Sequence, residues 1–573
     1  MRHKNKIMST VIAAILLSAT PVWAQEGGIQ IVQSETKQAP TQESVSVDKQ
    51  VPAKVAASLA KIKKLIPSLA DLTSMEKQLI PNKYGNGIKT WSIILSDRPE
   101  QADDEKEYTY AYLDFNAKTG QLVNMTYRNP EFASPDMPSD DLAKEKAEAF
   151  IQALLGDEMS DYKLSDRMGS GMTSYRDPAG KYKQSVYANV QFNRLVKNVP
   201  LSGFYAIVSV DEKGNILGYQ NIPTTEIDES KFADPSKALS ADEAKEAFSK
   251  QLEGQLAYNS KQPVVIYIGG SGNMETKPFL KYEFNAPIID AITGEVSEEL
   301  SHGRTGNTNI PVTLKPTGEG FSIRNQAEAE AFLKEELHLD LTDLEFEKVD
   351  LPEENEIYYV WSKGYGDKND EPRRIRLHVN TTNNQIEYFA TTDVTPSKND
   401  DLISKDQAQE FVETFLSNYV TEEKQVVISH LELIDSPINI PDWVDQNKLD
   451  KDILDNSTPH YLIRVNGLHN GIQVEDESFS FTLDAHTGAL KNLNARNVRA
   501  NVELPASDKL VSKADAQQAF ADATELQLEY IWPTFFGQVA PEPVLVYSPS
   551  SDWKFVDAVS GKVITVEHRS DKK

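Results

Sequence analysis

Asp484-Ala-His-Thr-Gly488 decides the fold of this chain, because five related turns recur along the sequence in a fixed order. An Asp or Asn at the first position can accept hydrogen bonds from the backbone two residues ahead. The closing glycine supplies a left-handed conformation from which a second strand begins. Alternating strands flank each turn, so each predicts a β-hairpin. The other turns are Asn116-Ala-Lys-Thr-Gly120, Asp211-Glu-Lys-Gly214, Asp290-Ala-Ile-Thr-Gly294, Asn380-Thr-Thr-Asn-Asn384 and Asp557-Ala-Val-Ser-Gly561.

The last three turns repeat the first three at a distance of about 270 residues, which is the signature of an internal duplication. Asn384 replaces glycine in the fourth turn, and Asn is the non-glycine residue that best tolerates the left-handed conformation. Trp91-Ser92 reappears as Trp361-Ser362. We therefore expect Trp91 and Trp361 to fill the same core position in two tandem blocks of three units each.

An amphipathic helix precedes five of the six hairpins, and its start is readable in the sequence. Ser240-Ala-Asp-Glu243, Ser404-Lys-Asp-Gln407 and, more loosely, Ser512-Lys-Ala-Asp515 have the spacing of capping boxes. The first unit has a longer, less clearly capped helical stretch from Pro52 to Ile66. A helix followed by antiparallel hairpins predicts an α+β fold, in which each unit packs one helix on one antiparallel sheet.

The turn and helix signals divide the chain into nine segments. They are a signal peptide (1–24), a flexible linker (25–50), unit 1 (51–132), unit 2 (139–225), unit 3 (238–300), an inter-block linker (301–320), unit 4 (321–395), unit 5 (402–500) and unit 6 (507–570).

The amino-terminal segment has the pattern of a cleaved secretory signal. It combines basic residues at Arg2, Lys4 and Lys6 with an apolar run over 11–17, and the mature chain is expected to begin near Gln25. No later segment reaches the ~20 consecutive apolar residues that a membrane helix needs. We therefore expect a secreted, extracellular protein without a membrane span, either released or held non-covalently at the cell envelope.

Composition excludes several functions. The 573 residues include no cysteine, which rules out disulfides, thiolate metal sites and catalytic thiols. The formal net charge of −28 makes nucleic acid and anionic membranes unsuitable partners, because both require a basic face. A cationic partner or divalent ions fit this charge better, although acidity also serves solubility alone.

The middle unit of the first block carries a family resemblance. Asn198-Val-Pro-Leu-Ser-Gly203 and the stretch from Val210 to Tyr219 resemble PepSY-like modules and the amino-terminal propeptides of thermolysin-type metalloproteases. The six-unit arrangement resembles the secreted YcdB/YcdC repeat proteins of Gram-positive bacteria. The resemblance implies propeptide-like function and restraint of proteases, while the YcdB/YcdC proteins have no assigned activity.

The sequence holds no recognisable catalytic constellation. A metalloprotease helix would read His-Glu-x-x-His, and no such stretch occurs. His460 and His469 form the closest histidine pair of the mature chain, and two surface histidines are the favoured interpretation over a metal site. Gly269-Gly-Ser-Gly272 lacks the context of a phosphate loop or a nucleophile elbow, so we interpret it as an ordinary loop.

No cofactor is expected. Three acidic loops offer oxygen ligands for calcium, but none has the complete calcium-binding pattern, so solvated turns are the favoured interpretation. These loops are 103–105, 366–371 and 442–447. Trp443 and Trp532 lie outside the repeat pattern and are the candidates for an aromatic binding surface, with core packing as the alternative.

Two hypotheses from different classes remain open. The leading one is a non-enzymatic interaction protein that binds an extracellular protein or envelope component, and that in its sharper form restrains a protease in trans through sheet edges or loops. The alternative is a cell-wall or polysaccharide hydrolase with its site between the two blocks, and a third is a calcium-dependent structural protein. The sequence leaves the partner and the oligomeric state open.

Overall fold

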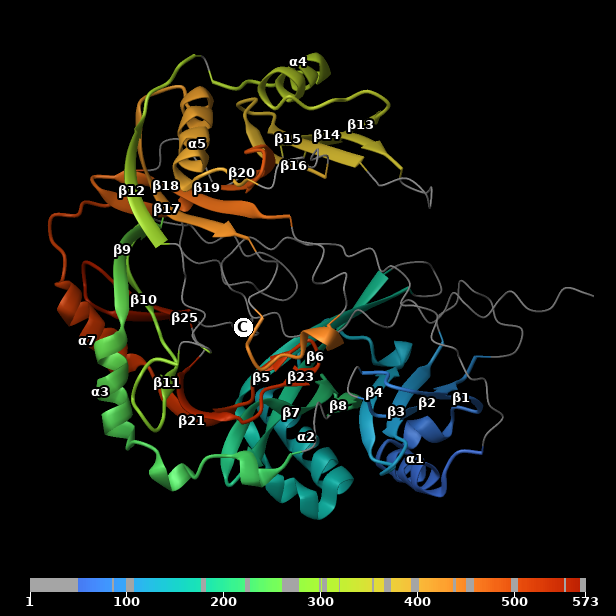
Figure 1. Cartoon of the computed structure of the whole chain (residues 1–573). Coiled ribbons are helices and arrows are strands. Elements are labelled where there is room, and N and C mark those ends of the chain that lie inside the picture. Colours follow the sequence, from blue (N-terminus) through green and yellow to red (C-terminus); the bar gives the residue numbers. More distant parts are fainter. Residues whose placement is uncertain are drawn as a thin grey trace, which may run out of the picture. The chain divides into compact units, whose positions relative to one another are not determined.

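The computed structural model describes most of the chain after residue 49, and all described residues belong to one compact unit, Asp48–Lys573. The described ranges are 50–84, 87–98, 108–176, 182–221, 227–259, 278–297, 300, 307–318, 320–352, 355–364, 373–392, 401–435, 440–449, 458–495, 503–550 and 553–566. The expected signal peptide lies outside them, as does the expected linker except for residue 50. The architecture is mixed α+β, with two large, mainly antiparallel sheets and few helices (Figure 1).

The first sheet has eleven strands. Its main path runs β1 (Ser74–Ile80), β2 (Thr90–Ser96), β3 (Tyr110–Asn116), β4 (Leu122–Arg128), β8 (Ile216–Gln220), β7 (Val199–Asp211), β21 (Leu526–Ile531), β24 (Val544–Pro549) and β11 (Ile289–Asp290). The long strands β5 (Tyr162–Arg176) and β6 (Tyr182–Val196) join it through β7. Strands β6 and β7 pair antiparallel and form a hairpin of the second unit that precedes the one at Asp211.

The second sheet has thirteen strands and repeats the same order. Its main path runs β13 (Glu345–Leu351), β14 (Glu356–Lys363), β15 (Arg373–Asn380), β16 (Ile386–Thr391), β20 (Leu490–Asn494), β19 (Ile472–Asp484), β9 (Glu253–Asn259), β10 (Phe279–Asn285), β25 (Trp553–Asp557) and β26 (Val563–Val566). Strands β18 (His460–His469), β17 (Lys424–Ile434) and β12 (Asn307–Leu314) extend it beside β19. Strand β12 lies within residues 301–320, which the sequence predicts as a linker, so part of that segment is built into the sheet. A separate two-stranded sheet joins β22 (Thr534–Phe535) and β23 (Gln538–Val539).

The helices pack on the sheets. They are α1 (Ala53–Leu65), α2 (Asp140–Leu155), α3 (Ala241–Gln251), α4 (Gln326–Ala331), α5 (Lys405–Tyr419) and α7 (Lys513–Ala523). Of these, α1, α3, α5 and α7 begin where the sequence predicts. Short 3-10 helices cover Pro67–Ala70, Pro130–Phe132, Gly156–Asp161, Glu229–Lys231, Pro235–Lys237 and Gln446–Lys448. Reciprocal capping boxes are confirmed at Ser240 with Glu243 and at Ser404 with Gln407. At Ser512 the hydroxyl accepts a hydrogen bond from the backbone of Asp515, which is half of that arrangement.

The predicted turn chemistry is confirmed. In the turn that begins at Asp484, the carboxylate accepts hydrogen bonds from the backbone nitrogens of His486 (3.1 Å) and Thr487 (2.9 Å). Gly488 closes this turn with a φ of 72°, and Asn384 adopts a φ of 59° at the equivalent place. The same side-chain-to-backbone bonds form at Asn116, Asp211, Asp290, Asn380 and Asp557.

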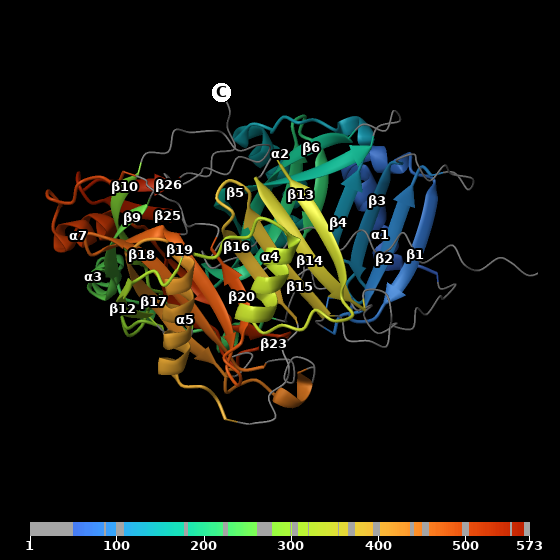
Figure 2. The ribbon, with the colours of Figure 1, turned by 90° about the horizontal axis from the view of Figure 1, so that it is seen from above.

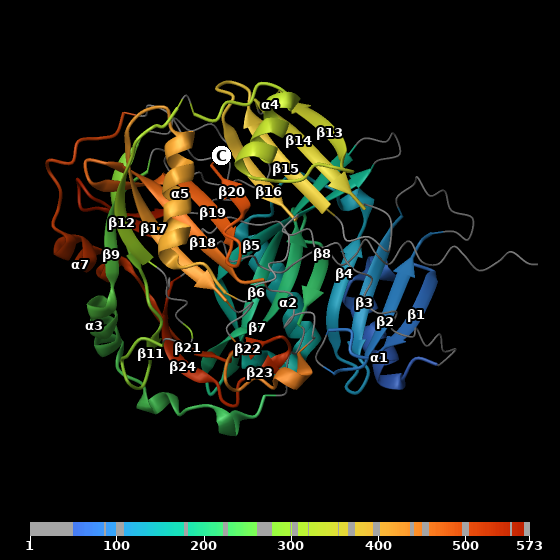
Figure 3. The ribbon, with the colours of Figure 1, turned by 45° about the horizontal axis from the view of Figure 1, so that its top comes forward.

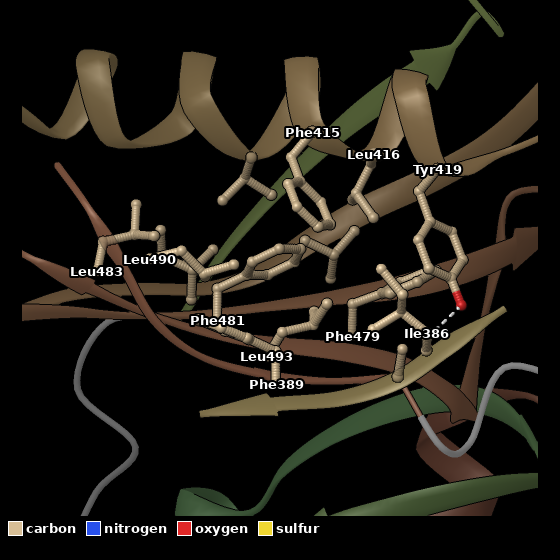
Figure 4. Packing of buried hydrophobic residues seen from close by; sticks show 14 of the residues in the cluster. Ile386, Phe389, Phe415, Leu416, Tyr419, Phe479, Phe481, Leu483, Leu490 and Leu493 are labelled. Carbon is tan, nitrogen blue, oxygen red and sulfur yellow. Dashed lines mark hydrogen bonds between the residues drawn. The ribbon is translucent and has the colours of Figure 1, made fainter. Parts of the chain in front are cut away.

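The largest hydrophobic core lies between α5 and the second sheet. Figure 4 shows Phe415, Leu416 and Tyr419 of α5 above Phe479 and Phe481 of β19. The phenol of Tyr419 donates a hydrogen bond of 2.8 Å to the backbone carbonyl of Ile386, so its buried polar end is satisfied (Figure 4). A second core fills the space under α1 and α2 in the first block, and a third combines residues of units 3 and 6.

The expected equivalence of Trp91 and Trp361 is wrong. Trp91 pairs with Phe115, whereas Trp361 pairs with Ile375, so the position that matches Trp361 in the first block is Leu95, the partner of Ala111. The β1–β2 connection spans residues 81–89 and the β13–β14 connection only 352–355, so the equal sequence spacing hides a shift along the strand. Both tryptophans are still buried, because a shift of an even number of residues keeps a side chain on the same face.

Units 3 and 6 exchange their central hairpins. The β9–β10 hairpin pairs with β19 and β25 in the second sheet, while the β21–β24 hairpin pairs with β7 and β11 in the first. Figure 2 shows green β9 and β10 beside red β25, and Figure 3 shows red β21 and β24 near green β11. The two blocks therefore do not form separate domains, because each sheet is completed by strands from the other block.

Candidate functional site

Strands β1 and β13 each begin the main path of one sheet, and they are equivalent in position and similar in sequence. In the described part of the chain, β1 pairs with β2 alone and β13 with β14 alone. Ile80 pairs with the first residue of β2, and Leu351 pairs with the first residue of β14. This register aligns Ser74-Met-Glu-Lys-Gln-Leu-Ile80 with Glu345-Phe-Glu-Lys-Val-Asp-Leu351.

Each edge strand exposes one large apolar side chain at the same place. Met75 is 50% exposed and Phe346 is 36% exposed, although both are bulky hydrophobic residues. The adjacent Glu-Lys pair is charged, as is common on edges that avoid uncontrolled strand pairing. An exposed edge with an apolar side chain can accept an extended strand of another protein through backbone hydrogen bonds.

A cavity of about 220 Å³ opens beside β13. Phe346 and the buried Trp361 form its aromatic side, with ring centroids 5.2 Å apart, and Leu341 and Leu344 add aliphatic surface. Its remaining lining residues are Glu330, Lys334 and Thr342. Pockets for drug-sized ligands usually measure about 300–1,000 Å³, so this cavity suits a side chain better than a cofactor.

The backbone around this cavity departs from regular structure. Helix α4 continues into a π-helical segment over Phe332–Glu336, and such segments occur frequently at functional sites. His338 and Asp343 in the following connection adopt φ values of 54° and 63°. Non-glycine residues are uncommon in this left-handed region. The segment between α4 and β13 therefore has an irregular backbone beside the cavity.

A cluster of buried polar groups lies on the face of the first sheet opposite its core. The carboxylate of Asp114, which is fully buried, accepts hydrogen bonds from Lys83 (2.7 and 2.9 Å), from Ser92 (2.6 Å) and from the phenol of Tyr84. The Lys83 ammonium also lies 4.2 Å from the ring centre of Tyr112. Burial lowers the pKa of Lys83, and the neighbouring Asp114 opposes this effect. Burial, with the charge of Asp114, raises the pKa of Tyr84.

Among the described residues of the second block, no counterpart of this ion pair occurs. His378 occupies the place of Asp114, and its ring stacks at 3.7 Å on Tyr358, which occupies the place of Ser92. Lys83 and Tyr84 come from the longer β1–β2 connection, which β13 and β14 do not share. The Lys83–Asp114 pair therefore anchors a loop that belongs to the first block alone.

A second charged cluster lies where the exchanged β9–β10 hairpin meets β19. The fully buried ammonium of Lys281 lies 2.7 Å from a carboxylate oxygen of Glu475 and 3.1 Å from one of Glu283. Trp553 and Phe555 of β25 cover it, with ring centres at 5.3 and 5.9 Å. One cluster thus joins strands from both blocks.

The pKa values of Glu475 and Lys281 both depart from their ordinary values in this cluster. Burial raises the pKa of Glu475 to about 8, the adjacent Glu283 adds to the rise, and Lys281 opposes it. Burial lowers the pKa of Lys281, but the two carboxyl groups outweigh this effect and raise it overall. At neutral pH Glu475 therefore holds its proton in the folded protein.

No pattern in the sequence predicts this cluster. Lys281 and Glu283 alternate with the core residues Leu280, Tyr282 and Phe284, as polar residues do on any half-solvated strand. Sequence alone does not separate a polar face that is covered by other strands from one that is open to water. The pairing of β10 with β25 supplies the cover.

The structure places Trp532 in a core and not on a surface. Its side chain is 4% exposed, and its ring packs against Phe204 and Phe232. Its indole nitrogen donates a hydrogen bond of 2.8 Å to the backbone carbonyl of Ala540. Trp443 is half-buried and packs against the same core. Core packing, the alternative weighed for these residues, therefore describes Trp532.

The other sequence candidates are not brought together. His460 and His469 stand at opposite ends of β18, where a rise of ~3.3 Å per residue separates them by roughly 30 Å. In the acidic loop 442–447, Asp445 caps a short 3-10 helix by accepting from the backbone of Asn447. The loops at 103–105 and 366–371 and the stretch Gly269–Gly272 lie outside the described residues.

The described residues include neither a cluster of metal ligands nor a membrane-spanning helix. They contain no group of three or more His, Cys, Asp or Glu side chains arranged to hold a metal ion. None of the helices within the described ranges is long and apolar enough to cross a membrane.

The fold defines an α+β protein with two large, mainly antiparallel sheets and few helices. Residues 69–221 match the model of the YcdB, YcdC repeated domain, so this segment is similar to that family. The matched residues span β1 to β8 and include α2, which corresponds to most of the first two expected units. This family description names no reaction. The expected resemblance to YcdB/YcdC proteins is confirmed for this segment.

Two solved structures are similar to parts of the chain. The Bacillus megaterium YpeB C-terminal domain shares 14% identity over 42% of this chain and 95% of that chain, with a TM-score of 0.25. An uncharacterised protein from Eubacterium rectale ATCC 33656 shares 13% identity over 44% of this chain and 85% of its own, with a TM-score of 0.23. Curated proteins gave no significant match.

Proposed function

We propose that this chain is a secreted, non-enzymatic interaction protein that binds another extracellular protein or an envelope component through its sheet edges. The observation that carries the proposal is the pair of equivalent outer strands, β1 and β13, each with an exposed apolar side chain. The signal-peptide pattern of residues 1–24 supports export. The match to a repeated domain without a named reaction is in keeping with a binding role.

Strand addition is the proposed mode of binding. An extended partner segment would pair with the backbone of β1 or β13, and its alternate side chains would contact Met75 or Phe346. Restraint of a protease in trans is the sharper form of this function. A protease loop or tail held as an added strand would be kept from its own substrates.

The test uses the mature protein from Gln25 as bait against culture medium and envelope fractions of the source organism, in calcium and in chelator. Cross-linking with mass spectrometry locates the contact, which is expected at β1 or β13. Secreted metalloproteases are assayed in parallel with a micromolar excess of the protein. Contacts confined to other surfaces would overturn the edge-binding proposal, and full protease activity would remove the restraint hypothesis alone.

A second candidate function is a cell-wall or polysaccharide hydrolase. The observation that favours it is the Glu283–Glu475 carboxyl pair at the meeting of the two blocks, because a carboxyl group kept protonated at neutral pH can act as a general acid. Against it, the Lys281 ammonium that bridges the pair is fully buried. Turnover of labelled peptidoglycan or polysaccharide that disappears in Glu475→Gln would establish this candidate, and absence of turnover would remove it.

A further inference from the structure

We propose that the β13 edge and its cavity bind an extended, basic segment of a partner protein, with one large apolar side chain of that segment inserted into the cavity. The inference rests on the proposed binding function and names the chemistry of the partner. It applies to β13 and not to the equivalent β1, which makes the first block an internal control.

The cavity fits one large apolar side chain. Its volume of about 220 Å³ is small, and Phe346, Trp361, Leu341 and Leu344 present aromatic and aliphatic surface to it. At its rim, the Lys334 ammonium lies 3.2 Å from a carboxylate oxygen of Glu330, so these two charges are already paired. An inserted apolar side chain would cover the exposed part of Phe346 without burying an unpaired charge.

The cavity lies beside a strand edge that faces no other strand of the described chain. A segment that pairs with β13 would run along Glu345, Phe346 and Glu347, all of which are exposed. Successive side chains of an added strand alternate between the two faces of the sheet. One side chain can therefore reach the cavity while its two neighbours face the opposite side.

Charge selects a basic segment. Between residues 326 and 351, which form α4, the π-helical turn, the connection and β13, there are nine Asp or Glu residues and two Lys residues. The equivalent range 53–80 in the first block has two Asp or Glu residues and five Lys residues. Although the two edge strands share position and pattern, their surroundings carry opposite charge. Lys or Arg residues beside the inserted side chain would thus be attracted to β13 and repelled by the surroundings of β1.

The proposal is tested with a synthetic probe. A fluorescent peptide of sequence KVKFKVK is titrated with the mature protein and its anisotropy is followed. Binding is expected to weaken at least about tenfold when the peptide's Phe is replaced by Ala, and by a similar factor when its four Lys are replaced by Glu. Binding should also weaken as salt is raised, because the attraction is partly between exposed charges.

Matched protein variants locate the site. Phe346→Ser and Glu347→Lys are each expected to weaken peptide binding at least about tenfold, whereas Met75→Ser and Glu76→Lys at the equivalent positions leave it unchanged. Glu347, Met75 and Glu76 are exposed, so their variants should melt close to the parent protein. Phe346→Ser is expected to lower the melting temperature modestly, because the ring of Phe346 also contacts Trp361. Equal effects of the β1 and β13 variants would overturn the assignment to β13.

The outcomes separate this inference from the proposed function. Cross-links of a natural partner to β1, without peptide binding at β13, would overturn the inference and leave the edge-binding function standing. Absence of both would overturn both. Self-association in sedimentation experiments that Phe346→Ser abolishes, without binding of the basic peptide, would assign the edge to a second copy and likewise overturn the inference.

Discussion

The phenol of Tyr282 donates a hydrogen bond of 3.0 Å to the backbone carbonyl of Val511, and the phenol of Tyr547 donates one of 2.7 Å to the carbonyl of Leu239. The two bonds are reciprocal, since each ties a strand of one block to the residue that leads into a helix of the other. The backbone repeats the relationship: Ala291 donates to the carbonyl of Leu545, and Ala558 to that of Leu280. The two blocks are therefore interlocked through units 3 and 6.

The first prediction concerns the halves of the chain. A fragment of residues 51–300 is expected not to fold cooperatively by itself. It would leave the β7 edge without β21, and it would expose the apolar face of β9–β10, whose neighbours β19 and β25 belong to the other half. Circular dichroism during thermal unfolding and limited proteolysis would show a broad transition and rapid cleavage.

Mixing provides the matching control. Equimolar fragments 51–300 and 301–573 are expected to associate and to recover a sharp transition, because the missing strands are then supplied in trans. A fragment of residues 51–300 that unfolds sharply at the temperature of the whole protein would show that the exchange of hairpins is dispensable.

The local turns and helix starts could be predicted from the sequence, but the exchange of hairpins between units 3 and 6 could not. The turns at Gly120 and Gly488 and the helix starts at Ser240 and Ser404 are set by residues a few positions apart, so the sequence contains the whole signal. In unit 3, strand β10 could pair with β11 of the same unit or with β25 of unit 6, and the structure shows the pairing with β25. Both choices pair similar strands, and the sequence pattern does not distinguish them.

The charged clusters escaped prediction for a related reason. Asp114 has the same alternating pattern as a solvent-facing residue, and its burial depends on a loop that folds over the sheet. Trp532 shows the opposite error, because its place outside the repeat suggested a surface role although the residues that cover it come from unit 2 and the segment before unit 3.

The second prediction compares two glycines with the same backbone conformation. Gly120 has a φ of 81° and Gly203 a φ of 80°. A Cβ atom at position 120 would lie 2.8 Å from the Cβ of Lys54 in α1, whereas one at position 203 would meet nothing within 4 Å. Gly203→Ala should cost only the left-handed strain of about 1–2 kcal/mol, and Gly120→Ala about 1 kcal/mol or more beyond that because α1 must move. Denaturant midpoints measure the difference, and equal losses would contradict the close approach of α1.

The third prediction concerns the buried pair of Lys83 and Asp114. Asp114→Ala is expected to destabilise the protein by about 3–5 kcal/mol, since it leaves the ammonium of Lys83 without its carboxylate. The double variant Lys83→Met, Asp114→Ala should lose less than Asp114→Ala alone, because no unpaired charge remains. A double-mutant cycle in denaturant measures this coupling. Additive losses would mean that the two side chains do not stabilise each other.

The last prediction concerns pH and the cluster of Lys281, Glu283 and Glu475. The pKa of Glu475 is about 8 in the folded protein and ordinary, near 4.3, in the unfolded chain. Between these values the folded state holds a proton that the unfolded state has released. Its contribution to stability is therefore full below about pH 4 and is lost as pH rises towards 8. The limiting slope for one proton is about 1.4 kcal/mol per pH unit.

Glu475→Gln keeps the shape of the side chain and removes its titration. The melting temperature of the parent protein is expected to fall relative to that of Glu475→Gln as pH rises from 5 to 8, with the two curves diverging over that window. In the first sheet the positions that correspond to Lys281, Glu283 and Glu475 are Val546, Ser548 and Ser202, as the pairing of β21 with both β7 and β24 aligns them. Ser202→Ala is thus the matched control at the other exchanged hairpin, and it should leave the pH dependence of the parent unchanged. Parallel curves for the parent and Glu475→Gln would show that Glu475 carries no proton in the folded protein, whereas divergence would mean that the joint between the blocks weakens when that proton is lost.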